Sequence, residues 1–258
     1  MAISILLGIS AFLFAAEDVH RKAYEQYQAG SKAFVERRFD VAIRALRQSL
    51  ELDPKQLRVM RLLGLSYQLA GQLADAEAAF RSAAVLYPND AESWYYLGRL
   101  YYVRNFFDRS LDALQKSAKL APKDARVREC LALTWEAIGD ASAAEKEYIQ
   151  ARGLASPPAT LDMNYGALLL KLNRVEESEP LLRKAVTSMP QSWQAHFELG
   201  RLYYLTGRMT ESLRELEAAA GCEATEEEMR RTQAMLANVY TRLGRHEEAQ
   251  RAAAAAEK

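Results

Sequence analysis

The chain has 258 residues, half of them apolar, and this proportion excludes an intrinsically disordered protein. Lysine and arginine together number 34, and aspartate and glutamate also number 34, so the formal net charge is zero. A neutral chain has no global field that would draw it to nucleic acid or to an anionic membrane. We therefore expect no nucleic-acid partner, and any electrostatic recognition must come from local groups.

The residues that most often carry metal binding or catalysis are few and scattered. The two cysteines, Cys130 and Cys222, have neither CxxC spacing nor a histidine cluster beside them, which predicts free thiols and no metal site. His20, His196 and His246 are isolated, and the chain has no HExxH, GxSxG or glycine-rich phosphate loop. We expect no catalytic residues and no cofactor.

The N-terminus differs in kind from the rest of the chain. Ile3–Ala16 is an unbroken run of apolar or small residues, and two acidic residues follow it. The run is too short to span a bilayer comfortably, but its length suits the apolar core of a secretory signal peptide. Residues 1–16 are therefore predicted to be a signal peptide or an N-terminal anchor. The alternative is a hydrophobic segment that caps the first folded unit.

The stretch Ala91–Pro122 shows the organisation of everything that follows the leader. Trp94, Leu97, Gly98 and Tyr101 form one stripe of a first helix, and a second helix has its own apolar stripe before the proline. Neither helix can bury its stripe alone, so copies of the hairpin are expected. Copies on a 34-residue period begin at Ala23, Leu57, Ala91, Ala125, Ala159 and Trp193, and a seventh begins near Arg230.

Small residues and turn residues follow the same period. With Ala91 as position 1, positions 8, 20 and 27 hold glycine, alanine or serine in every repeat, which predicts close approach of the two helices. Position 15, where the first helix should end, holds glycine or asparagine except at Arg37. Three residues are predicted to cap first helices, Asp90, Asp124 and Ser192, and Thr225 with Glu228 forms a candidate capping box.

The pattern of WYYLG, then tyrosine, then small residues, an aromatic or leucine and a proline resembles the tetratricopeptide repeat family over residues 23–258. The resemblance implies an all-α fold, a right-handed superhelical solenoid of antiparallel helix hairpins, with residues 17–258 as one domain. It also implies a concave groove, lined mainly by first helices, that holds a peptide or protein segment.

Positions 2, 5, 9 and 12 of each first helix form a stripe separate from the buried one, and we expect this stripe to face the groove. Several of these positions hold arginine or tyrosine, which suit recognition of peptide carboxylates and carbonyls. The segment LGRLYY occurs twice, at Leu97–Tyr102 and at Leu199–Tyr204. The predicted partner-binding residues are Arg58, Arg61, Tyr95, Arg99, Tyr102, Arg126, Phe197, Arg201, Tyr204 and Asn238.

Some members of the family bind chaperone C-termini through a clamp of lysines, an arginine and two asparagines. The nearest match here is Arg61, Leu65, Tyr96, Arg126 and Cys130, which lacks both asparagines. A chaperone adaptor is therefore not expected.

Two functions remain open at this point. The first is a non-catalytic scaffold that binds an extended segment of another protein in the groove. The second is a structural element of a cell-envelope complex that uses its convex face or its ends, without a groove ligand. The predicted location is exported if residues 1–16 are a signal peptide, and otherwise cytoplasmic or membrane-tethered. A membrane contact is expected only through an uncleaved N-terminal segment.

Overall fold

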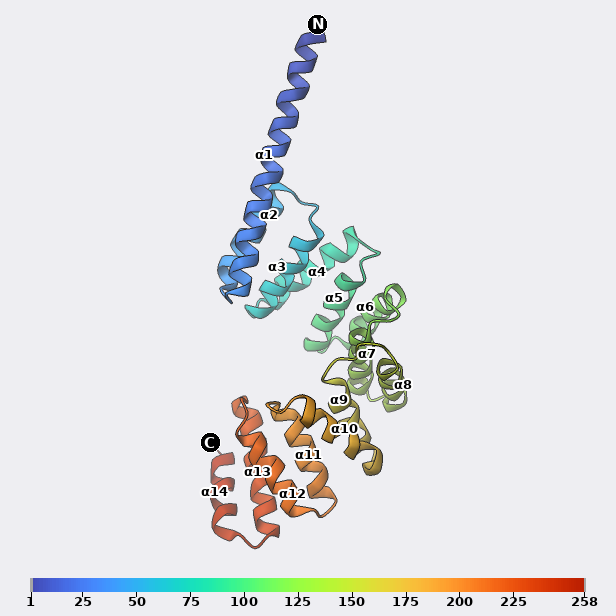
Figure 1. The fold of residues 1–258 in the computed structure, drawn as a ribbon, viewed down its shortest axis with the longest axis vertical. Coiled ribbons are helices and arrows are strands. Elements are labelled where there is room, and N and C mark those ends of the chain that lie inside the picture. Colours follow the sequence, from blue (N-terminus) through green and yellow to red (C-terminus); the bar gives the residue numbers. More distant parts are fainter. Residues whose placement is uncertain (1, 258) are drawn as a thin grey trace. The chain divides into compact units, whose positions relative to one another are not determined.

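The structure is a computed structural model that describes residues 2–257, with the side chains of residues 18–257. The described chain is all helical and consists of consecutive antiparallel hairpins (Figure 1). The helices are α1 (Ala2–Val35), α2 (Phe39–Leu52), α3 (Leu57–Leu69), α4 (Leu73–Leu86), α5 (Ala91–Val103), α6 (Phe107–Leu120), α7 (Ala125–Ile138), α8 (Ala141–Arg152), α9 (Leu161–Lys171), α10 (Val175–Ser188), α11 (Trp193–Leu205), α12 (Met209–Ala220), α13 (Glu226–Arg242) and α14 (His246–Ala256).

The 34-residue period fixes where most first helices begin. The starts of α3, α5, α7 and α11 coincide with the predicted repeat starts, because each follows a proline or a capping residue. Asp90, Asp124 and Ser192 accept hydrogen bonds from backbone N–H groups in the first turn of their helices, as predicted. The capping box of Thr225 and Glu228 is also present, and it starts α13 four residues before the predicted start near Arg230.

The turn inside each hairpin has a left-handed residue at position 15. All four glycines and both asparagines predicted there have φ between +59° and +95°. Arg37, the exception in the sequence, adopts the same conformation with φ +59°. The geometry of the turn therefore imposes this conformation on an arginine, although a Cβ disfavours it.

The close approach predicted from the small residues is present. A Cβ added to Gly64 would lie 2.5 Å from the ring of Phe80, and one on Gly98 would lie 2.6 Å from Leu114. Serines in these positions also form hydrogen bonds that their size alone did not indicate. The hydroxyls of Ser110, Ser178 and Ser212 each donate to the carbonyl oxygen of the position-8 glycine in the same hairpin, at 2.7–2.9 Å.

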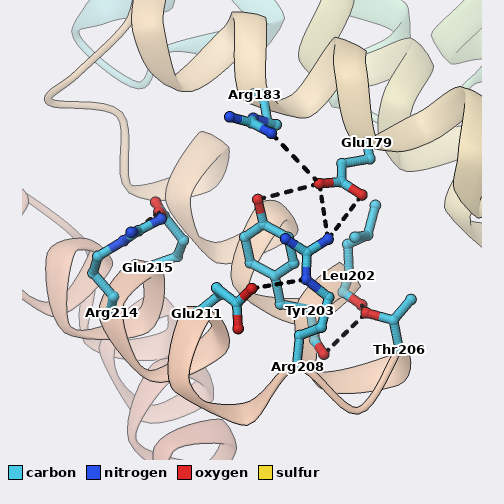
Figure 2. A network of polar contacts seen from close by, with 9 residues as sticks. All are labelled: Glu179, Arg183, Leu202, Tyr203, Thr206, Arg208, Glu211, Arg214 and Glu215. Carbon is cyan, nitrogen blue, oxygen red and sulfur yellow. Dashed lines mark hydrogen bonds and ion pairs between the residues drawn. The ribbon is translucent and has the colours of Figure 1, made fainter.

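Glutamates at position 21 tie consecutive hairpins together. Glu179 in α10 accepts hydrogen bonds from Arg208 at 2.9 and 3.0 Å and from the hydroxyl of Tyr203, so it binds both ends of the next turn (Figure 2). Glu77 likewise accepts from Tyr101 and from Arg104, but this arginine is the C-cap of α5 and lies before the turn. These contacts lie between repeats, whereas the apolar stripes lie mainly within them.

The chain divides into two compact units, residues 1–123 and residues 124–258. The prediction of one solenoid over residues 17–258 stays a prediction. In the first unit α1 packs on α2, and its N-terminal part continues past the end of α2 (Figure 1). The apolar run at residues 3–16 is thus helical and continuous with the first repeat. Within residues 2–257, no helix has a stretch long and apolar enough to cross a membrane.

Candidate functional site

In the first unit, the predicted groove residues lie on α3 and α5, which contact each other. Arg58 is exposed. Arg61 is half-buried, and its Nη1 lies 3.1 Å from Asp90 and 2.7 Å from Glu92 at the start of α5. Asp90 is also the cap of α5, so Arg61 is held by the next repeat and joins two first helices.

Tyr95, Arg99 and Tyr102 do not share one environment. Tyr95 is 7% exposed and packs against Tyr96, with ring centroids 5.4 Å apart. The guanidinium of Arg99 lies over the Tyr95 ring at 5.5 Å, while Tyr102 is half-buried beside Phe107. Arg99 and Tyr102, both half-buried, are therefore the accessible members of this cluster.

In the second unit, an aromatic pair on α11 supports an arginine of α13. Phe197 is 3% exposed and stacks on Trp193, with centroids 4.9 Å apart. The guanidinium of Arg231 lies 5.0 Å from the Phe197 ring and 5.6 Å from the Trp193 ring. Trp193 itself donates a 2.7 Å hydrogen bond to Thr232. The ring of Phe197 is thus covered by the exposed guanidinium of Arg231 and offers little surface of its own to a partner.

The remaining predicted residues of the second unit are more exposed. The half-buried ring of Tyr204 has the guanidinium of Arg242 above it at 4.9 Å, and Asn238 is exposed. Arg126 is exposed and forms two side-chain hydrogen bonds to Asp124, at 3.1 and 2.6 Å. This guanidinium holds the pKa of the Asp124 carboxyl below its usual range.

Glu198 is buried and forms an ion pair with the half-buried Arg201, without a well-aligned hydrogen bond. Glu198 is 8% exposed, and its Oε2 lies 3.1 Å from the Nε of Arg201. These two atoms are the buried side-chain atoms of residues 18–257 that have no hydrogen-bond partner. The pair is therefore close enough for Coulombic attraction but is not aligned for a hydrogen bond.

The charges around Glu198 come from four first helices. Burial raises the pKa of Glu198, and the nearby cations Arg201, Lys171 and Arg231 oppose that shift. Glu136 on α7 adds to the rise, although its own oxygens are bonded to Tyr148 at 2.6 Å and to Lys171 at 3.1 Å. Burial thus disfavours the charged form of this carboxylate, and cations of α9, α11 and α13 partly offset that effect.

We call the set Lys171, Phe197, Glu198, Arg201, Tyr204 and Arg231 the α9–α11–α13 face. Sequence analysis identified three of its members from their positions on α11. It missed Glu198, which lies at position 6, one place outside the predicted stripe. The available signal was that position 6 holds a carboxylate in this repeat alone, where the other repeats have Gln28, Leu62, Tyr96, Cys130, Asn164 and Met235.

The comparisons with known proteins agree with this architecture. The family model of the tetratricopeptide repeat matches residues 27–91, 61–125, 95–158 and 166–226. The chain belongs to the tetratricopeptide repeat family. The period and the small residues that suggested the family are thus confirmed, and the chain has the fold of protein-interaction scaffolds.

Individual relatives share the fold at low identity. Anaphase-promoting complex subunit 3 of Schizosaccharomyces pombe is 20% identical over 169 residues, which are 66% of this chain and 25% of the relative. A tetratricopeptide repeat protein of Parabacteroides merdae has a TM-score of 0.72 at 15% identity, covering 92% of this chain and 93% of that one. For PilF of Pseudomonas aeruginosa the TM-score is 0.68 at 16% identity, covering 80% and 93%. The chain thus spans a quarter of the length of the curated relative it matches.

Proposed function

We propose that the protein is a non-catalytic scaffold that binds an extended segment of another protein along the first helices of its hairpins. The observation that carries this proposal is the α9–α11–α13 face, where cations and aromatic rings gather around the incompletely bonded Glu198–Arg201 pair. Arginine and aromatic side chains dominate the binding energy of many interfaces. Buried polar atoms without hydrogen-bond partners are rare in folded proteins, which makes this part of α11 unusual.

Site-specific photocrosslinking in the native host tests this proposal. A photoreactive phenylalanine analogue at Arg58 or Asn238, which are exposed on first helices, is expected to form adducts with a partner protein. The matched control position is Ser82, which is exposed on the second helix α4. Adducts from Ser82 alone would overturn the assignment to first helices.

A second candidate function is an assembly element that binds through its second helices. The observation in its favour is a pocket beside the second helix of repeat 2, where a contact found in later repeats is missing. In repeats 3 to 6, the side chain at position 4 of the first helix contacts a residue of the second helix. The pairs are Trp94 with Lys116, Arg128 with Glu147, Asp162 with Lys184 and His196 with Glu215.

Repeat 2 lacks such a pair, because its second helix offers alanine and serine opposite Met60. A pocket of about 310 Å³ results there, lined by Arg47, Leu50, Pro54, Met60, Leu63, Tyr67, Asp75, Ala78, Ala79 and Ser82. The crosslinker at Ser82 lies at this pocket, so the same experiment separates the two functions.

We further propose that residues 1–16 direct export of the chain or anchor it to a membrane. The support is the apolar run Ile3–Ala16 in the sequence. N-terminal sequencing of the protein from its native compartment tests the proposal. A mature N-terminus at or just after Ala16 indicates cleavage, an intact leader in the membrane fraction indicates an anchor, and an intact leader in the soluble fraction contradicts both.

A further inference from the structure

The pocket beside Met60 exists because two side chains of α4 are small. In repeats 3 to 6, a charged side chain at position 23 or position 26 of the second helix contacts the residue at position 4 of the first helix. In repeat 2 these two positions hold Ala79 and Ser82, and both residues line the pocket. The pocket is thus the space that a long charged side chain takes in the later repeats.

The pocket has an apolar floor and a mouth that is open to solvent. Met60 and Leu63 of α3 form the floor and are only 6% and 7% exposed. Arg47 of α2 and Asp75 and Ser82 of α4 line the same pocket and are exposed. Pockets of a few hundred Å³ that combine apolar walls with a few polar groups are typical binding sites. A group from another molecule can therefore reach the floor of this pocket.

The polar groups of the pocket define the chemistry of a ligand. Burial raises the pKa of the Tyr67 hydroxyl, while Arg47 opposes this shift and Asp75 adds to it, so both charges act at the wall of the pocket. A guanidinium and a methionine thioether both pack favourably on aromatic rings. A carboxylate accepts a hydrogen bond from an N–H group. An aromatic ring that carries an N–H group therefore complements Arg47, Met60 and Asp75 together.

The next repeat shows how an indole fits at this place. Trp94 occupies position 4 of repeat 3, and the ammonium group of Lys116 lies 4.3 Å from the centre of its ring. The indole N–H donates a 2.9 Å hydrogen bond to the carbonyl oxygen of Pro88. Repeat 2 has Met60 and Ser82 at the positions of this ring and this lysine. A dry cavity of about 150 Å³ holds a benzene ring, so the 310 Å³ of this pocket has room for the larger indole.

The tryptophans of the chain itself are held within its own repeats. All three lie among the residues whose side chains the structure describes, and none is exposed: Trp193 is buried, and Trp94 and Trp135 are half-buried. A second copy of this chain therefore has no exposed indole to offer, and the occupant must come from a different protein.

We infer that the pocket between α2, α3 and α4 binds the indole of a tryptophan in another protein. The ring lies on Met60 with Arg47 beside it, and the indole N–H donates to the carboxylate of Asp75. This assignment rests on the second candidate function, since it names the side chain that the second helices of the first unit recognise. It does not depend on binding along the first helices, because Met60 lies in the stripe that faces the second helices.

The test uses three blocked pentapeptides, Ac-Ala-Ala-Xaa-Ala-Ala-NH2, in which Xaa is tryptophan, 1-methyltryptophan or leucine. They are titrated into the full chain with 13C-labelled methionine methyl groups. The Met60 resonance, identified by its loss in Met60→Leu, is followed by NMR. The tryptophan peptide is expected to move this resonance upfield, because the current of an aromatic ring shields a methyl group that lies over its face.

The other two peptides separate the ring from its N–H group. The 1-methyltryptophan peptide keeps the ring but cannot donate to Asp75, so it should move the Met60 resonance in the same direction and bind about tenfold more weakly. The leucine peptide has neither feature, so it should bind more weakly than the tryptophan peptide and cause no upfield shift.

Two lysine substitutions on α4 complete the design. Ser82→Lys places a lysine at position 26, as in repeats 3 and 5, and should abolish the response of Met60 to the tryptophan peptide. Val85→Lys adds the same charge about one turn further along α4, at a side chain that is 69% exposed and does not line the pocket, and it should leave binding unchanged.

Three results would overturn the inference. They are equal binding of the tryptophan peptide and either of the other two, equal effects of the two lysine substitutions, and an unmoved Met60 resonance at millimolar peptide. If Met60 does not respond while a photoreactive group at Ser82 still crosslinks to a partner, the second candidate function stands and only the tryptophan assignment fails.

Discussion

Leu114 occupies the space into which a side chain on Gly98 would grow, with a Cβ on Gly98 falling 2.6 Å from the Cγ of Leu114. Gly98→Ala is therefore expected to destabilise the protein by about 1–3 kcal/mol through overpacking, even though alanine favours helix more than glycine does. Urea unfolding monitored by circular dichroism measures the change. The control is Gly153→Ala, which should cost far less, because the atom nearest to an added Cβ would be the carbonyl oxygen of Gln150 at 3.4 Å.

The hydroxyl of Ser178 gives a prediction about hydrogen bonding without a change in packing. Ser178→Ala removes the 2.7 Å bond to the carbonyl oxygen of Gly166 and should cost about 1 kcal/mol in the free energy of unfolding. Alanine fits this position without strain, since Ala42, Ala76 and Ala144 are fully buried at the equivalent places. An unchanged midpoint in urea would show that the bond contributes nothing to stability.

Arg37 is expected to be a site where substitution stabilises the protein. Arg37→Gly relieves a φ of +59° and should add about 1 kcal/mol to the free energy of unfolding, because glycine adopts this conformation without a Cβ penalty. Thermal unfolding followed by circular dichroism measures the effect. The neighbouring Arg38 has φ −89°, so Arg38→Gly should instead lower the melting temperature. A loss of stability in both variants would contradict the strain at Arg37.

The buried carboxyl of Glu198 is expected to make the stability of the protein depend on pH. Burial raises its pKa, so the native state holds the proton more tightly than the unfolded chain does. The free energy of unfolding therefore falls as pH rises from the ordinary glutamate pKa of about 4.3 toward the raised native value.

Glu198→Gln should remove this part of the pH dependence. Above that pH interval the variant should be more stable than the wild type, and below it the stabilities of the two should differ least. Urea unfolding at several pH values measures the difference. Glu176→Gln, on the exposed part of α10, is the control and should not alter the profile. An identical pH profile for Glu198→Gln and the wild type would contradict the prediction.

Sequence alone predicted the elements that depend on local rules. The starts of α5 and α11, the caps Asp90 and Ser192 and the left-handed turns follow from neighbouring residues, and the structure confirms them. The start of α9 was placed two residues early at Ala159, because prolines 157 and 158 replace the usual signal.

The candidate site was less predictable, because its environment depends on contacts between repeats and on burial as well as on local spacing. A helical stripe places Arg61 on a face but cannot show that Asp90 and Glu92 bind it. The same stripe grouped Tyr95 and Phe197 with accessible residues, whereas both are largely covered by their aromatic neighbours. Whether the ten predicted residues contact a partner stays a prediction.

The serine bonds have a consequence for how the hairpins find their alignment. Apolar stripes and small residues repeat along a helix, so two such helices could slide past each other by one turn and still bury similar area. A hydroxyl inside that contact reaches the glycine carbonyl oxygen of the other helix in one alignment only, and a slip would lose this bond between the helices. The hydroxyls of Ser110 and Ser212 thus favour a single register for their hairpins, which apolar contacts alone specify poorly.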